Sequence, residues 1–162
     1  MTKTPMNKLK PIAATAVEEN PFLSLYPEPF AALMQGRTKR KLGEHFDLTN
    51  FGVNLTELAP GAISALKHYH LTQDEFIYIL SGTPTLVIGT EEYLLKPGEC
   101  CGFKKANNVA HQLINRSKSP VLYLEIGDRM PADQVNYPDD DLRAELTEEG
   151  TWEFLHKDGR EY

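Results

Sequence analysis

Short segments of alternating polar and apolar residues, separated by glycine- and proline-containing turns, occupy the middle of this 162-residue chain. The segments are residues 51–58, 62–69, 76–80, 85–88, 92–95, 100–103, 111–115 and 121–126. Strands of about four to eight residues with such turns are typical of an all-β sandwich or barrel. The same region lacks a helical pattern long enough for βαβ crossovers, which disfavours a parallel α/β sheet.

The region before these strands is irregular. Residues 1–36 contain five prolines and no sustained period. We therefore expect an arm packed over the main body, with its first ten residues mobile and one or two helical turns before Gly36. Residues 37–41, RTKRK, place four cations in five positions. A solvated loop or a guard of a sheet edge explains this cluster better than a phosphate site does.

The region after the strands changes again, so residues 37–127 are the predicted barrel and residues 128–162 a C-terminal extension. The prolines and the three consecutive aspartates of the extension indicate a surface excursion. Trp152 and Phe154 are apolar anchors, and we expect them to dock this tail on the barrel. An Asp-Gly pair at Asp158 predicts a terminal hairpin.

Composition narrows the possible functions. The net charge of −6 argues against bulk nucleic-acid binding, which needs a basic face. No apolar run approaches the ~20 residues that span a bilayer, and the N-terminal apolar patch is too short for a signal peptide. Cys100 and Cys101 are adjacent and predict no disulfide framework. We therefore expect a cytoplasmic protein with reduced thiols and no membrane or nucleic-acid partner.

Three histidines and a glutamate are placed to meet on one face of the predicted sheet. His68 and His70 are two residues apart, so on a strand both imidazoles project to the same side. Glu75 follows a short turn and opens the next strand, and His111 opens a later one. Three imidazoles and a carboxylate suit one divalent Fe, Mn, Ni, Co or Zn ion, with one or two coordination positions left open for a small molecule.

The same stretch resembles the first motif of the cupin superfamily, in which a glycine, an H-x-H pair, a glutamate and a second glycine follow one another. The matching residues are Gly61, His68, His70, Glu75 and Gly82. The second motif is matched in part, by the spacing of His111 and Asn115, whereas Lys104 and the residues after it replace the Pro and Gly expected before the histidine. The resemblance covers about residues 50–127. It implies a double-stranded β-helix, or jelly-roll, barrel with the metal inside.

Each site residue has an alternative reading. The four polar groups could be hydrogen-bonded remnants in a metal-free barrel, but several ionisable groups facing one interior are costly unless a cation pairs them. Asp74 could replace Glu75 as the carboxylate, yet the strand alternation favours Glu75, because it then shares its inward face with Ile77. Ile77 and Asn115 are candidate cavity-lining residues. For Asn115, a hydrogen bond that supports a metal ligand from behind, or one that caps a turn, is an equally good interpretation.

Two functions follow from a metal inside such a barrel. The first is an enzyme acting on a small oxygen-rich molecule, and the residues do not choose among a dioxygenase, an isomerase, a decarboxylase and a lyase. The second is a non-catalytic small-molecule-binding or sensor domain. A metal-free structural dimer is a third reading. The resemblance also implies a homodimer, because cupin-like sheets commonly dimerise through an outer apolar face, here the outward side chains Phe76, Tyr78 and Leu80.

Overall fold

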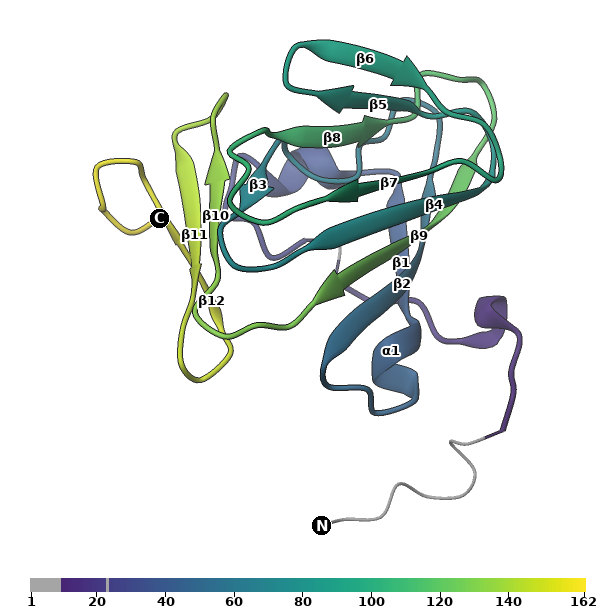
Figure 1. The fold of residues 1–162 in the computed structure, drawn as a ribbon, viewed down its shortest axis with the longest axis horizontal. Coiled ribbons are helices and arrows are strands. Elements are labelled where there is room, and N and C mark those ends of the chain that lie inside the picture. The colour runs from purple at the N-terminus through teal and green to yellow at the C-terminus, as the bar shows by residue number, and fades with distance from the viewer. Residues whose placement is uncertain (1–9, 23) are drawn as a thin grey trace.

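A computed structural model describes residues 10–22 and 24–162 (Figure 1). The strands are β1 (Arg37–Lys41), β2 (Phe51–Leu58), β3 (Tyr69–His70), β4 (Glu75–Ser81), β5 (Thr85–Ile88), β6 (Glu91–Leu94), β7 (Cys100–Phe103), β8 (His111–Ile114), β9 (Val121–Asp128), β10 (Gln134–Tyr137), β11 (Leu142–Leu146) and β12 (Trp152–Leu155). Helical turns are short: Ala14–Ala16, Ala31–Met34 and α1 (Leu42–His45). In the described residues, every ladder between these strands is antiparallel, which confirms the all-β prediction.

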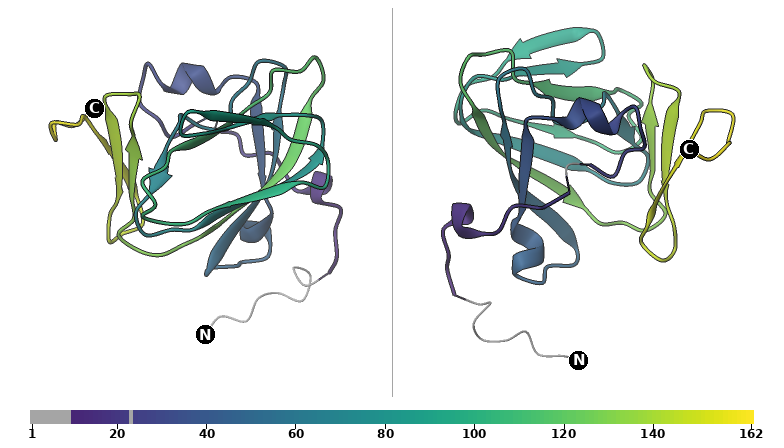
Figure 2. Two further views of the ribbon diagram at one scale, coloured as in Figure 1. Left: turned by 45° about the horizontal axis from the view of Figure 1, so that its top comes forward. Right: turned by 180° about the vertical axis from the view of Figure 1, so that it is seen from behind.

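The largest sheet has the order β1-β2-β9-β4-β7 and forms one wall of the barrel (Figures 1 and 2). Along its strands, side chains point alternately to the buried inner face and to the exposed outer face, as expected for a sheet that is buried on one side. On β4, Ile77 and Ile79 are buried among the core side chains, whereas Phe76, Tyr78 and Leu80 are exposed on the outer face. The inner face of this wall therefore carries Glu75 into the interior, because Glu75 shares the parity of the two isoleucines.

A three-stranded sheet, β6-β5-β8, faces this wall, and the chain before β3 runs along β8. The strand predicted over residues 62–69 was wrong in extent, because only Tyr69 and His70 form a ladder. Upstream, isolated bridges join Ile63 to Ile114 and His68 to His111. Between them the Ser64 hydroxyl accepts the backbone N–H of Leu113 at 3.0 Å, so a side chain takes over a ladder position.

The C-terminal strands make a third sheet, in the order β12-β11-β10-β3 (Figure 1). The surface excursion expected after residue 128 contains instead a hairpin, β10–β11. The hairpin forms because alternate residues of its two strands are apolar. These residues, Val135, Tyr137, Leu142 and Ala144, are all buried in a second apolar cluster. Partly buried Trp152 and Phe154 pack against this cluster, together with Tyr26 and Phe30 of the N-terminal region.

The basic segment at residues 37–41 is strand β1. The prediction of a solvated loop is therefore wrong, and the alternative, a position at a sheet edge, is right. β1 pairs along its whole length with β2 at the end of the five-stranded sheet. Residues before it cover the free edge: Glu19 forms a bridge and an ion pair with Arg40, and the Asn20 N–H donates to the Lys39 carbonyl. The expected mobile stretch falls mainly on residues 1–9, which lie outside the described residues.

Candidate metal centre

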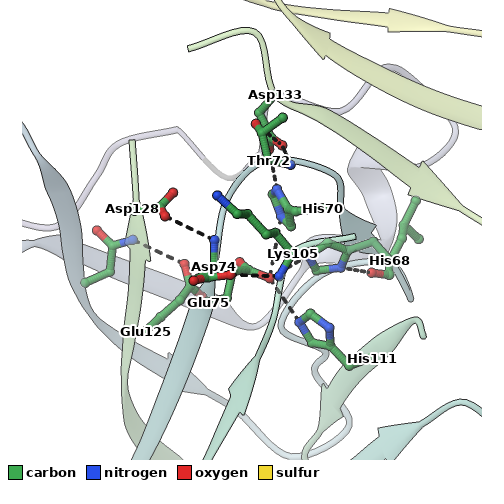
Figure 3. Close-up of polar contacts among 12 residues, drawn as sticks. His68, His70, Thr72, Asp74, Glu75, Lys105, His111, Glu125, Asp128 and Asp133 are labelled. Atoms are coloured by element: carbon green, nitrogen blue, oxygen red, sulfur yellow. Dashed lines mark hydrogen bonds and ion pairs between the residues drawn. The ribbon is translucent and has the colours of Figure 1, made fainter. Parts of the chain in front are cut away.

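The predicted ligands come from three parts of the barrel that backbone hydrogen bonds hold in register. His68 and His111 exchange both backbone bonds, with N–O distances of 3.1 and 2.9 Å, so they form one residue pair. His70 lies two residues further on, in β3, and Glu75 begins β4. The strand ends therefore present all four side chains to one space (Figure 3).

The three imidazoles converge on one carboxylate oxygen of Glu75. Glu75 Oε2 lies 3.1 Å from Nε2 of His111 and 3.5 Å from Nε2 of both His68 and His70. Ligand atoms of His68, His70 and Glu75 all lie within 4.8 Å of one another. Glu75 Oε2 is buried, yet none of the residues that the structure describes gives it a hydrogen bond. A carboxylate oxygen surrounded by imidazole nitrogens but left without a donor fits a site built for a cation.

The outer ring nitrogens fix how two of the imidazoles point. His68 Nδ1–H donates to the Leu66 carbonyl at 2.7 Å, and His70 Nδ1–H donates to Asp133 Oδ2 at 2.5 Å. Each bond places the proton on Nδ1 and leaves Nε2 with a free lone pair that points inward. This is the tautomer of histidine that binds a metal through Nε2. His111 is positioned by packing, because its ring stacks on Phe103 with centroids 3.6 Å apart.

Asp133, which the sequence analysis did not single out, is fully buried behind His70. Its second oxygen accepts the backbone N–H and the hydroxyl of Thr72, each at 2.9 Å. It lies 63 residues from His70 in the chain, immediately before β10. Since the β10–β11 hairpin was not predicted, no local signal linked this aspartate to the histidines.

Charges in the cluster compensate one another. Burial acts to raise the pKa of Glu75, but the contacts and charges of His111, His68 and His70 outweigh it and hold that pKa well below its usual value. Burial acts to lower the pKa of His70, and the bond to Asp133 together with Glu75 raises it above the ordinary value. For His111, burial prevails and lowers the pKa. The carboxylate is therefore ionised at neutral pH and ready to bind a cation.

Replacing Asp133 with asparagine is expected to weaken divalent-metal binding about 10–100-fold, the usual cost of losing an outer partner of a ligating histidine. The asparagine oxygen can still accept from Thr72, but its NH₂ then faces His70 Nδ1. That contact favours the tautomer with the proton on Nε2, which has no lone pair for a metal. Titration of metal-free protein with Mn²⁺ or Zn²⁺ measures the change.

Asp141→Asn is the matched control, because Asp141 accepts from His156 Nδ1 at 2.8 Å on the exposed tail. It should leave metal affinity unchanged. Equal affinities for D133N and the wild-type protein would show that Asp133 does not orient a ligand.

A cavity of about 410 Å³ opens in front of this cluster. All four predicted ligands line it, as does Ile77. The inner faces of β1, β2 and β9, which belong to the same sheet as Glu75, form a further part of its wall. The N-terminal arm contributes further lining residues, Asn20, Phe22, Ser24, Leu25 and Tyr26. The volume lies in the range typical of small-molecule sites, about 300–1,000 Å³.

The remaining candidates lie elsewhere. Asp74 points away from the cluster, and its carboxylate accepts the Lys105 N–H at 2.8 Å (Figure 3). Asn115 is fully buried outside the cavity lining, where its amide donates to the carbonyls of Leu58 and Ser119. This is a turn-bracing position, the alternative weighed for it above. Both cysteines are free thiols, and Cys100 is exposed.

Comparison with known proteins agrees with this architecture. The family model for the cupin domain matches residues 54–127, the stretch from β2 to β9. A comparison with curated proteins found no match. Within the described residues, no helix is both long and apolar enough to cross a membrane.

Solved structures extend the likeness over nearly the whole chain. A sugar phosphate isomerase of a cupin superfamily from Silicibacter pomeroyi DSS-3 is 35% identical, with 94% of this chain and 96% of that chain covered and a TM-score of 0.89. A proposed sugar phosphate isomerase from Acidithiobacillus ferrooxidans is 31% identical, with coverage of 74% and 76% and a TM-score of 0.69. The polyketide cyclase RemF from Streptomyces resistomycificus, 20% identical with coverage of 74% and 78% and a TM-score of 0.59, shares the fold. The barrel, the motif residues and these similarities together show that the chain belongs to the cupin superfamily.

Proposed function

We propose that this chain is a divalent-metal-dependent isomerase that interconverts the aldose and ketose forms of a small sugar phosphate. The observation that carries the proposal is the buried, unsatisfied Glu75 oxygen, ringed by three imidazole nitrogens at one side of the cavity. The similarity of 35% over 94% of the chain to a sugar phosphate isomerase supports the choice of reaction.

The donor set would hold one divalent cation through Nε2 of His68, His70 and His111 and a carboxylate oxygen of Glu75. Bound there, such an ion supplies Lewis-acid polarisation of a carbonyl or hydroxyl oxygen. The chain itself positions the sugar, excludes water and moves protons. Since Glu75 would serve as a ligand, a different group has to carry the proton between neighbouring carbons.

The cavity is also suited in charge to a phosphorylated substrate. Arg37, Lys39 and Lys41 project from the inner face of β1 and line it. A protein of net charge −6 thus places three cations of one strand in its cavity, where Lys39 is paired with Glu125 and Lys41 with Glu44. Cationic side chains are the usual recognition groups for phosphate. From the sequence alone, a phosphate site was the less favoured interpretation of residues 37–41. Their position in the cavity supports it.

The test is turnover by untagged protein that has been stripped of metal and reloaded in turn with Mn²⁺, Fe²⁺, Co²⁺, Ni²⁺ or Zn²⁺. Pentose and hexose phosphates, with their unphosphorylated sugars as controls, are followed by NMR. We expect one aldose–ketose pair to interconvert with at least one metal, and the stripped protein to be inactive. Metal-loaded protein that binds a sugar phosphate but converts none of them would identify a binding protein instead of an isomerase.

We also propose that the protein works as a cytoplasmic homodimer. The exposed side chains Phe76, Tyr78 and Leu80 on the outer face of β4 support self-association through this sheet. Sedimentation of the wild-type protein and of a variant with Tyr78 replaced by glutamate is expected to give a dimer and a monomer, respectively. A wild-type monomer would contradict this part of the proposal.

A further inference from the structure

A second polar group lies inside the same cavity, outside the metal cluster. Lys39 Nζ and Glu125 Oε1 form an ion pair at 2.6 Å, and the Asn54 amide donates to the same oxygen at 3.2 Å. The Tyr123 hydroxyl donates to Glu125 Oε2 at 3.3 Å. All four residues line the cavity, and the Lys39 and Glu125 side chains each remain 23% exposed. The pair is therefore accessible to a molecule in the cavity.

The register of β4 and β9 fixes where Glu125 stands relative to Glu75. Glu75 is paired with Gly127 and Ile77 with Glu125, so the two glutamates are diagonal neighbours on the same face. Such neighbours lie roughly 7–8 Å apart. Gly127, opposite Glu75, places no side chain between them. Figure 3 shows Glu125 in the same group of polar side chains as Glu75 and the histidines. One small substrate can therefore contact both the metal cluster and Glu125.

The ion pair is not needed to join its strands. β1 pairs with β2 through five residue pairs, and β2 with β9 through eight. An ion pair within a barrel is costly to desolvate and contributes little net stability compared with an apolar pair. Burial acts to raise the pKa of Glu125, but the charge and hydrogen bond of Lys39 outweigh this and lower it. The arrangement thus keeps an ionised carboxylate facing the substrate space.

We propose that Glu125 is the catalytic residue that carries the proton between C1 and C2 of the sugar, with Lys39 as the cation that holds it ready. This inference rests on the proposed isomerase function. In the aldose-to-ketose direction, Glu125 takes the C2 proton, the C2–H electron pair becomes the C1=C2 double bond, and the carbonyl π pair moves to O1. Glu125 then returns the proton to C1 while the O2 proton passes to O1 and C2=O forms. Substrate and product are isomers, so no oxidant or reductant is required.

The test compares the wild-type protein with Glu125→Gln and Glu125→Asp, each loaded with metal. The readouts are kcat, metal content, binding of a non-reactive sugar-alcohol phosphate by calorimetry, and deuterium uptake at carbon in D₂O. Glu92→Gln is the matched control, because Glu92 forms a comparable ion pair with Arg116 on the outer surface.

For E125Q we expect kcat to fall about 10²–10⁴-fold, the usual contribution of general acid–base catalysis. Metal content and analogue binding should stay within about threefold of the wild-type values, because the metal is held by the histidines and Glu75 and, with Lys39 paired to Glu125, the phosphate is left to Arg37 and Lys41. E125D should retain more activity than E125Q, since it keeps the charge but moves the carboxylate back by one methylene. Product made by the wild-type enzyme in D₂O should carry deuterium at carbon.

Three results would overturn the inference. If E125Q is within tenfold of the wild-type kcat, Glu125 is not the proton carrier. If E125Q and E125D both lose metal and analogue binding together with activity, the pair is structural. If the wild-type enzyme converts the sugar without taking up deuterium and E125Q still converts it, hydrogen moves directly between the carbons. Failure of the wild-type enzyme to convert any sugar phosphate would instead overturn the proposed function, and the role of Glu125 with it.

Discussion

Replacing His70 with alanine should lower the affinity for a divalent metal by more than about 100-fold, beyond the 10–100-fold that loss of an outer partner costs. The substitution removes one imidazole nitrogen from the ring around Glu75 Oε2 and deprives Asp133 of its partner. Mass-spectrometric metal content of untagged protein measures the effect, and circular dichroism checks that the barrel remains folded. Thr72 still donates two hydrogen bonds to Asp133, which limits the structural cost.

His156→Ala is the control, because His156 is also paired with an aspartate, Asp141, but lies on the tail against Tyr162. Its metal content should equal that of the wild-type protein. Equal metal loss in both variants would mean that the ligands have been wrongly assigned.

Replacing Gly82 with alanine should destabilise the fold by about 3 kcal/mol or more. Gly82 has φ of +81°, and an added Cβ would lie 2.7 Å from the Pro120 carbonyl oxygen and 2.8 Å from Val121 Cγ2. The left-handed conformation costs an alanine about 1–2 kcal/mol, and overpacking adds about 1–3 kcal/mol. For a domain of this size, the melting temperature should fall by about 6–12 °C. Urea unfolding and calorimetry measure both quantities.

Gly61→Ala separates the two contributions. Gly61 has nearly the same φ, +84°, but no atom of residues 10–22 and 24–162 lies within 4 Å of the position of its Cβ. This variant should therefore lose only about 1–2 kcal/mol. Equal losses for the two variants would show that backbone strain alone, and not the contact with residues 120–121, explains the glycine that closes the first motif.

The barrel strands could be predicted from the sequence because alternation and turn residues are local signals. The predicted segments 51–58, 85–88 and 100–103 coincide with β2, β5 and β7. Where the prediction failed, non-local partners decide the structure. Residues 63–68 join β8 only through isolated bridges at Ile63 and His68, so β3 is limited to the two residues that pair with β10. β1 becomes a strand because β2 pairs with it.

The metal cluster was within reach of sequence reasoning because three of its members, His68, His70 and Glu75, share one strand–turn–strand unit. The other polar groups of the cavity were not. Asp133 reaches His70 through a hairpin, and Lys39 reaches Glu125 across two strand pairings, over 86 residues. Neither pair can be recognised from the pattern of neighbouring residues in the sequence. Only the tertiary structure shows that the two members of each pair are in contact.

Crystals of untagged protein grown with Mn²⁺ or Zn²⁺, with anomalous scattering recorded at the metal edge, test the central claim most directly. We predict one strong peak per chain, about 2.0–2.2 Å from Nε2 of His68 and His70 and from a Glu75 oxygen, with His111 as the remaining ligand. A fully occupied metal elsewhere on the chain, or these side chains turned apart around an ordinary water molecule, would contradict it.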